Sequence, residues 1–281
     1  MTIASEVSRP LGTMVAYGFA EVDLEGDFEV ARRLGAAVLE IFPDWRVLPD
    51  PRALRARVDD LGLAIHSAHG CWGGKSIRAT RVDLGSPELG THRESVEDLK
   101  RCVDWLHEVG GACLVVHPGG LSDPAQTAPR RAALAGGLIA LADHSRDTGV
   151  VLCVENMPPG VHPGSRMVDL AALITDLGRP ELALALDTGH AQIVSDPHSE
   201  TVAAGPWLRT THVHDNNGRQ DSHLPPGQGS IDWDAWARSL EMVGYRGPIM
   251  LECIRHLRND PGCIDDAMRE LLGRMTAIAK G

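Results

Sequence analysis

Short apolar runs alternate with helical patterns through the whole chain of 281 residues. Eight of these runs have the length and the aliphatic or β-branched composition of buried strands. Between them, apolar residues recur at the spacing of an amphipathic helix. The runs cover residues 14–17, 37–42, 63–66, 113–117, 150–155, 182–187, 210–214 and 249–252. Eight strand-then-helix units in a chain of this length predict an α/β protein with a closed (β/α)8 TIM barrel.

A doubly wound open sheet is the alternative fold. It usually has fewer strands and a glycine-rich phosphate loop after its first strand, whereas residues 17–21, YGFAE, are not a GxGxxG sequence. No linker or shift of composition divides the chain, so we expect one domain over residues 1–281, with a flexible N-terminus over 1–11. Asp27 and Asp50 are expected to cap the first two helices, and a short helix is expected around residues 200–204.

Composition limits which partners the protein can bind and indicates the compartment in which it works. The net charge of −11 disfavours nucleic acid and anionic membrane surfaces. Residues 1–11 lack the features of a signal peptide, and no apolar run reaches membrane-spanning length. The six cysteines form no CxxC pair, and Cys113, Cys153 and Cys253 lie in apolar runs, which indicates small core residues in a reducing compartment. We therefore expect a cytoplasmic protein.

Polar residues recur where the predicted strands end. The carboxyl ends of barrel strands converge on one face, where such enzymes place their chemistry. Each residue alone has an ordinary explanation, such as a helix cap, a core histidine or a pair between Glu252 and Arg255. A buried carboxylate is costly unless it is paired or bound to metal, so one shared metal centre explains the whole set. Its members are Glu40, His66 or His69, His117, Glu155, Asp187, His212 and Glu252.

Strand alternation indicates where these side chains point. In residues 182–187, LALALD, Asp187 shares a face with Ala183 and Ala185, which we expect to face the barrel axis. By the same rule, Glu155 shares a face with Cys153. The ligand candidates are therefore expected to project into the barrel, while the alternating leucines face the helices.

Residues 211–233 concentrate imidazoles and carboxylates in a few turns of chain. Alternation places His212 and His214 on one side of the seventh strand, and Asp221 and His223 follow beyond a turn. A hydrated polar loop with scattered histidines is the ordinary interpretation. A site for a divalent metal ion is the leading one, because these are its usual ligands.

The sequence resembles the xylose isomerase-like TIM barrel superfamily, in particular its sugar phosphate isomerase/epimerase proteins. This superfamily also contains the apurinic endonucleases. The similarity covers the third to the eighth strand. It rests on Ala68-His69-Gly70, Val115-Val116-His117-Pro118-Gly119, Val154-Glu155-Asn156, Leu186-Asp187-Thr188-Gly189-His190, His212-Val213-His214-Asp215, Asp221-Ser222-His223 and Leu251-Glu252.

The resemblance implies one divalent ion (Mn²⁺, Zn²⁺, Co²⁺ or Mg²⁺) held by Glu155, Asp187, His212 and Glu252. It implies a sugar isomerase or epimerase that moves a proton next to a carbonyl through an enediolate, with Glu155 and Glu252 as base and acid. Further ions can be accommodated at His69 and His117 and at His190, Asp221 and His223, as in the endonucleases. The expected partners are a small carbohydrate and, as in related barrels, a second copy of the chain in a homodimer or higher oligomer. The expected substrate contacts are His69, His117, His190, His214, Asp221, His223, Glu40 and Trp72.

Three alternatives stay open. The same site can serve a lyase or dehydratase acting on an oxidised sugar or inosose, or a multi-metal phosphodiesterase of the endonuclease type. It can also belong to a barrel that binds without turnover. The endonuclease first-strand motif is missing from residues 15–19, VAYGF. Two further expectations are that Trp45 and Phe42, together with Trp72, stack on a sugar face, and that Asp221 and His223 reach the cavity without holding the principal ion.

Overall fold

The computed structural model describes residues 8–72 and 82–278. Eight parallel strands run in the order β7-β6-β5-β4-β3-β2-β1-β8. Val213 closes the barrel, because its N–H donates to Met250 O at 2.7 Å and its carbonyl accepts from Glu252 N at 3.0 Å. The predicted (β/α)8 barrel is confirmed. The strands are β1 (Leu11–Tyr17), β2 (Val38–Pro43), β3 (Ala64–His69), β4 (Cys113–Val116), β5 (Val151–Glu155), β6 (Leu182–Asp187), β7 (Leu208–His212) and β8 (Ile249–Leu251).

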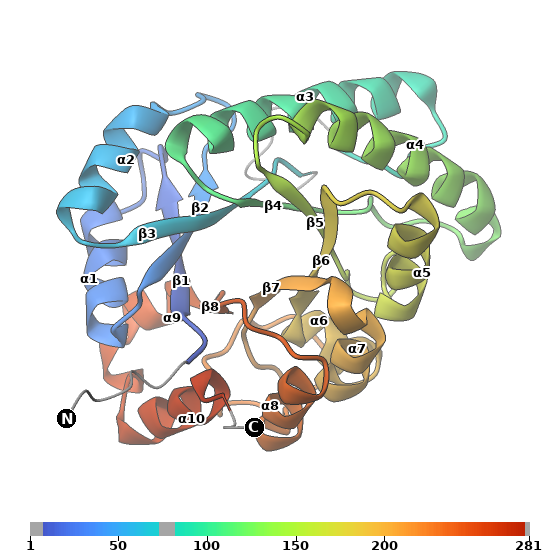
Figure 1. Ribbon diagram of the computed structural model, residues 1–281. Helices are drawn as coiled ribbons and strands as arrows, with labels where there is room; N and C mark the ends of the chain where they lie inside the picture. The colour runs from blue at the N-terminus through green and yellow to red at the C-terminus, as the bar shows by residue number, and fades with distance from the viewer. Residues whose placement is uncertain (1–7, 73–81, 279–281) are drawn as a thin grey trace, which may run out of the picture.

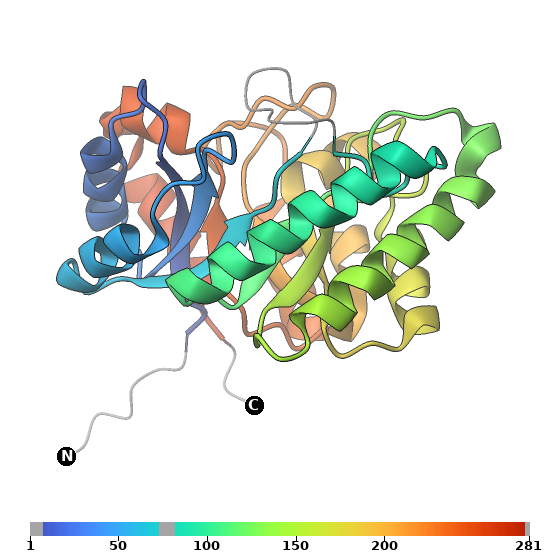
Figure 2. The same ribbon diagram turned by 90° about the horizontal axis from the view of Figure 1, so that it is seen from above.

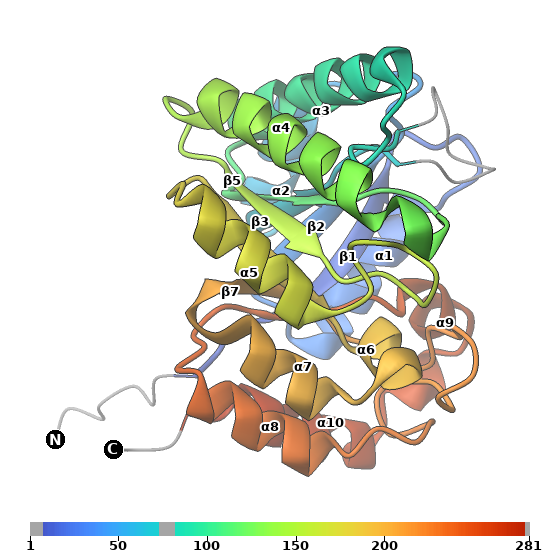
Figure 3. The same cartoon turned by 90° about the vertical axis from the view of Figure 1, so that its right-hand side faces the viewer.

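Helices surround the strands (Figure 1). In this outer ring α5 packs against α7, α7 against α8, and α8 against α10 (Figure 3). None of the helices in the described residues is long and apolar enough to cross a membrane. The helices are α1 (Leu24–Leu34), α2 (Pro51–Asp60), α3 (Leu89–Val109), α4 (Thr127–Ser145), α5 (Met167–Leu177), α6 (Thr188–Val194), α7 (Pro197–Ala204), α8 (Trp233–Met242), α9 (Ile254–Asn259) and α10 (Asp266–Thr276).

Helix α1 begins one turn earlier than predicted. Its cap is Asp23, whose carboxylate accepts from Gly26 N at 3.0 Å. Asp27 lies inside the helix and is fully buried, where it accepts from Ala16 N at 3.0 Å and from Arg258 at 2.7 Å. The prediction that Asp27 caps the helix is therefore wrong. Its carboxylate instead joins α1 to β1 and α9, whereas Asp50 caps α2 as predicted.

Between β6 and β7 the chain forms two helices rather than the single short helix predicted around residues 200–204. Helix α6 follows β6 directly, and Asp187 caps it by accepting from His190 N at 2.7 Å. A second aspartate, Asp196, caps α7 through Ser199 N. The two capping aspartates are nine residues apart, so each begins a helix of its own in a segment where the sequence predicted one.

The barrel interior carries small apolar side chains, as strand alternation predicted. A separate cluster inside the barrel consists of Cys113, Val115, Cys153, Ala183 and Ala185. The leucines of β6 belong to the larger core between the strands and the helices. All six cysteines are free. Small residues at mid-barrel leave room for the longer polar side chains above them.

The first and last described segments of the chain meet at one end of the barrel, and the long loop after β7 lies at the other (Figure 2). Arg9 is 1% exposed and donates to Tyr245 O and Met275 O, both at 3.1 Å. Ser8 pairs with Ala277. The expectation of a flexible N-terminus is therefore wrong for residues 8–11, and residues 1–7 lie outside the described ranges.

Candidate functional site

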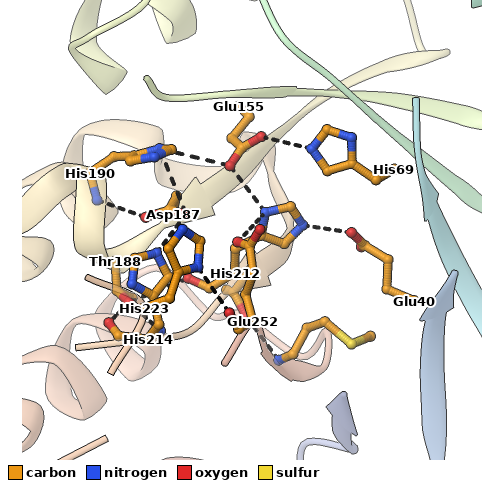
Figure 4. Close-up of polar contacts among 12 residues, drawn as sticks. Glu40, His69, Glu155, Asp187, Thr188, His190, His212, His214, His223 and Glu252 are labelled. Atoms are coloured by element: carbon orange, nitrogen blue, oxygen red, sulfur yellow. Dashed lines mark hydrogen bonds and ion pairs between the residues drawn. The ribbon is translucent and has the colours of Figure 1, made fainter. Parts of the chain in front are cut away.

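Four polar side chains meet at the carboxyl end of the barrel. Glu155, Asp187 and His212 are the last residues of β5, β6 and β7, and Glu252 directly follows β8. One ligand atom from each lies within 4.8 Å of the others. Figure 4 shows these side chains directed toward one another. The structure thus brings together all four residues predicted to hold the principal ion.

These four residues fit a divalent metal ion. His212 Nδ1 lies 3.0 Å from both Glu155 Oε1 and Glu252 Oε2. Glu155 Oε2 and Glu252 Oε2 are buried, yet neither accepts a hydrogen bond of normal geometry from any residue in the described ranges. Buried acceptors left without donors are costly. Three carboxylates and one imidazole whose ligand atoms converge are a donor set that a divalent ion satisfies.

Opposite charges in this cluster hold one another ionised. Burial disfavours the charged form of His212, but the carboxylates of Glu252, Glu40 and Glu155 outweigh burial and raise its pKa well above the ordinary value. Burial likewise opposes ionisation of Glu155, and His212, with His117 and His69, nevertheless holds its pKa well below the usual range. Glu155 is therefore a carboxylate at neutral pH, which is the form that binds a cation.

Glu40 lies behind His212, not at the cavity surface. Its side chain is completely buried, and Oε1 is 2.8 Å from His212 Nε2. The Ser67 hydroxyl donates to Oε2 at 2.5 Å. The prediction that Glu40 contacts substrate is therefore wrong, because its position in mid-strand places it below the ligand layer. A carboxylate on the far nitrogen of an imidazole orients the ring, and here it turns Nδ1 toward Glu155 and Glu252 of the ligand set.

Asn156 and Gly189 fix the strand ends that carry the ligands. The Asn156 amide accepts from Asp187 N at 2.7 Å and donates to Asp187 O at 3.0 Å, which ties β5 to β6. A β-carbon on Gly189 would lie 1.9 Å from a carbon of the His214 ring, so only glycine fits there. Both residues belong to conspicuous sequence motifs, but the sequence alone did not reveal their supporting roles.

Asp215 organises the loop after β7 and was not predicted as a site residue. It is fully buried and accepts from Gly227 N at 3.0 Å, Ile231 N at 3.2 Å and Trp233 Nε1 at 3.0 Å. One carboxylate thereby holds the base of the loop that carries Asp221 and His223. No local pattern distinguishes it from an ordinary turn aspartate.

Comparison with known proteins identifies the family. A family model described as the xylose isomerase-like TIM barrel matches residues 28–274. The chain belongs to the xylose isomerase-like TIM barrel family. The resemblance inferred from the sequence motifs is therefore confirmed.

Several relatives in this family are named as epimerases. The chain is 28% identical over 149 residues to a D-psicose 3-epimerase from Agrobacterium fabrum, covering 52% of this chain and 50% of that protein. It is 25% identical over 239 residues to an L-ribulose 3-epimerase from Methylomonas sp., covering 82% and 78%. The chain spans between 50% and 69% of the length of three curated relatives. The crystal structure of a D-tagatose 3-epimerase-like protein superposes with a TM-score of 0.75 at 21% identity, covering 94% and 97% of the two chains.

In this xylose isomerase-like barrel two of the four ligand residues, Glu155 and Glu252, line a cavity of about 610 Å³. Trp72 packs against Phe42 and His69, with ring centroids 4.5 Å from each, and all three line the cavity. His117 and His190 line it as well. Trp45 does not, since it is 7% exposed and its indole donates to His69 O at 3.0 Å. The expectation that Trp45 stacks on a sugar is wrong, and its ring supports β3 instead.

Two further groups of residues could hold a cation. The first is His69, His117 and Glu155, and the second is His214, Asp221 and His223. His69 and His117 were predicted as a pair, and Glu155 completes their set. For the second group the prediction named His190 in place of His214. His190 Nε2 still lies 3.4 Å from Asp221 Oδ2, so it borders this group.

His214 is buried beneath the cavity and does not line it. Its Nε2 is 3.0 Å from Asp187 Oδ2, and its ring stacks on His223 with centroids 4.0 Å apart. The prediction that His214 contacts substrate is therefore not supported by its position: the side chain is fully buried and does not line the cavity. His214 instead packs between Asp187 and His223.

His223 is held in an unusual backbone conformation at the cavity wall. Its φ is 47°, which is uncommon for a residue other than glycine. Its ring bonds at both nitrogens, to Glu252 O at 3.0 Å and Asp221 Oδ2 at 3.1 Å. Strain of this kind persists where the surroundings fix it and often marks a functional position.

The imidazoles beside Asp221 are strongly basic. Burial disfavours the charge on His190, but Asp187, Asp221 and Glu155 outweigh it and raise its pKa to about 10. Burial also opposes the charge on His223, whose pKa Asp221 and Glu252 raise to about 10. In the absence of an ion, both rings are therefore positively charged at neutral pH, and both line the cavity.

Proposed function

We propose that the protein is a metal-dependent sugar epimerase or isomerase that transfers a proton at a carbon next to a carbonyl group. The observation that carries this proposal is the placement of Glu155 and Glu252. Both belong to the four-residue ligand set, both line the larger cavity, and they come from different strands. Two carboxylates facing one cavity suit removal of a proton by one and its return by the other.

The residues of the site divide this chemistry between them. When bound, a divalent ion would act as a Lewis acid and acidify the carbon-bound proton next to the substrate carbonyl. Glu155 and Glu252 would exchange that proton as base and acid. His190 would donate to the substrate oxygen on which negative charge develops. Trp72 and Phe42 would pack against the sugar ring or chain. The names of the curated epimerases agree with a ketose as the substrate class.

Exchange of a carbon-bound proton with deuterated water tests this proposal. The panel comprises ketoses, inososes and keto-glycosides, and deuterium incorporation is followed by NMR with and without added Mn²⁺ or Co²⁺. We expect ion-dependent exchange that falls about 100-fold or more in Glu155→Gln and Glu252→Gln. Glu94→Gln, an exposed glutamate on α3, is the matched control and should exchange like the wild type.

Other outcomes separate the alternatives. Absence of exchange across the panel would count against the proposal. Loss of water from an inosose or oxidised sugar would assign the same residues to a lyase. Sugar binding without any reaction, unchanged in Glu155→Gln, would indicate a barrel that binds without turnover.

A multi-metal phosphodiesterase is the second candidate, because there are three candidate ligand sets and each contributes at least two residues to the lining of the larger cavity. Metal analysis distinguishes the two functions. About three tightly bound zinc ions per chain, together with cleavage of abasic DNA, would favour the phosphodiesterase. A single exchangeable ion and no cleavage would favour the epimerase or isomerase.

A further inference from the structure

The cavity at the ligand residues has a second lobe that the proposed proton transfer does not use. This lobe has a volume of about 460 Å³. It shares Phe42, Asp221, His223 and Glu252 with the larger cavity. A substrate whose reacting carbon lies at Glu252 can therefore extend into the second lobe without leaving the site.

Helix α9 supplies the polar wall of the second lobe. Arg255, His256 and Asn259 line it from this helix, and Met14 and Ala16 line it from β1. Arg255 is exposed and makes no hydrogen bond or ion pair with the residues in ranges 8–72 and 82–278. Its guanidinium is charged at any physiological pH and presents a planar set of donors.

The other charged groups around the second lobe already have partners. Arg258, on the same helix, is bound to the buried Asp27 at 2.7 Å. On the border shared with the larger cavity, Asp221 lies 3.1 Å from His223 Nε2, and Glu252 lies 3.0 Å from His212 Nδ1. Arg255 is thus the side chain whose charge is left uncompensated in the second lobe.

The larger cavity has a different lining. Its described lining residues include Trp72, Val82, Leu121 and Met157, and no arginine or lysine. Its histidines face carboxylates, as His117 faces Glu155 and His190 faces Asp221. Among the described residues, an anionic group would therefore find an unpaired arginine on one side of the reacting centre and apolar side chains with paired histidines on the other. Such asymmetry fixes which way round an elongated substrate binds.

We propose that the second lobe binds an anionic group, a phosphate or a carboxylate, carried by the substrate away from its reacting carbon. This inference rests on the proposed function for the identity of the reacting carbon. Arginine binds both groups in a two-pronged geometry, and such charge-assisted hydrogen bonds are stronger than neutral ones. His256 and Asn259 add hydrogen-bonding side chains beside the guanidinium.

Binding to the metal-loaded protein tests the inference with three matched probes. D-fructose, D-fructose 6-phosphate and D-fructuronate differ at the carbon farthest from the ketone end. Calorimetry should show tighter binding of an anionic probe than of D-fructose. Arg255→Ala should weaken binding of that probe about 10- to 100-fold and leave D-fructose nearly unchanged. Arg255→Lys should recover part of the loss, because lysine keeps the charge without the planar fork.

The control and the probes make the outcome decisive. Arg238→Ala removes an exposed arginine from α8, outside both cavities, and should bind all three probes like the wild type. Tighter binding of the phosphate than of the carboxylate identifies a phosphate ester, and the reverse order identifies a sugar acid. Equal weakening of neutral and anionic probes in Arg255→Ala, or no preference for either anion in the wild type, overturns the inference.

The proposed function and this inference can fail separately. An anion preference that depends on Arg255, without deuterium exchange on any substrate, would support the anion-binding site and contradict the epimerase or isomerase function. Exchange on neutral ketoses, without any effect of Arg255→Ala on binding of the anionic probes, would support the epimerase or isomerase function and contradict the anion-binding site.

Discussion

The two halves of the barrel contribute differently to the site. Strands β5 to β8 supply the four residues of the principal ligand set. Strands β2 to β4 supply residues that touch those ligands: Glu40 lies 2.8 Å from His212 Nε2, and His117, just after β4, lies 3.1 Å from Glu155 Oε2. The first half therefore orients the ligands that the second half provides.

The difference extends to how each ligand is supported. His212 and Glu155 are contacted from the first half of the barrel, by Glu40, His69 and His117. Asp187 is held within the second half, by Asn156 and by the start of α6. Substitutions in the first half should consequently lower metal affinity while all four ligands remain. Substitutions in the second half should remove a ligand.

The largest expected effect is loss of the principal ion from His212→Ala. This change removes one of four ligands, so metal affinity should fall by more than the 10- to 100-fold typical of groups that only support a ligand. His223→Ala should retain the principal ion and lower turnover about 10- to 100-fold. Metal content and affinity of the two purified variants decide the matter. Equal loss of the principal ion from both would show that the ligand set is assigned wrongly.

A smaller effect is expected from Glu40→Gln, which tests the first half of the barrel. Glutamine keeps the size of the side chain but loses the negative charge that faces His212 Nε2. The four ligands stay in place, so metal affinity should fall about 10- to 100-fold, measured by competition with a chelating dye. Glu94→Gln on α3 is the matched control. Unchanged affinity in Glu40→Gln, in a variant that melts like the wild type, would contradict the orienting role.

Residues at strand ends could be predicted because sequence and geometry agree there. Asp187 ends an apolar run, so the sequence predicted a cap or a functional residue, and the structure shows it capping α6 and lying in the candidate ligand set. Glu155 likewise ends β5. The barrel itself followed from eight repeated units, since each amphipathic helix needs a strand face on which to bury its apolar side.

The burial of individual side chains was harder to predict than the strands. Glu40 lies inside the predicted run over residues 37–42, and the structure likewise places it in mid-strand, below the ligands. Its contact with His212 could not be predicted, because His212 belongs to a distant strand, β7. The burial of His214 depends in the same way on Asp187 and His223, which come from other parts of the chain.

The second lobe could not be predicted from the sequence, for another reason. Helix α9 has six residues, too few to show a helical period. Arg255 could be interpreted only as a partner of Glu252, and the structure places Glu252 against His212 instead. A role for side chains on such a short helix can be inferred only when the cavity that they line is known.

The smallest expected effect concerns stability of the metal-free protein and belongs to the second half of the barrel. Burial opposes the charge on His223, but Asp221 and Glu252 raise its pKa from 6.5 to about 10. A group with a higher pKa in the folded state stabilises the fold fully below its unfolded pKa, and this contribution is lost as the pH rises through the folded value. The stabilisation should therefore be complete below about pH 6.5 and disappear toward pH 10.

The variant His223→Gln isolates this contribution, because glutamine can hydrogen-bond but carries no charge. Asp221 has a lowered pKa, so its own contribution is lost only in acid, below this window. After removal of metal by a chelator, the melting temperature of the wild type should exceed that of His223→Gln most at about pH 6. The difference should shrink steadily as the pH approaches the folded pKa of about 10. A difference that stays constant over this range would show that His223 is neutral in the folded protein and that Asp221 does not hold it as a charged partner.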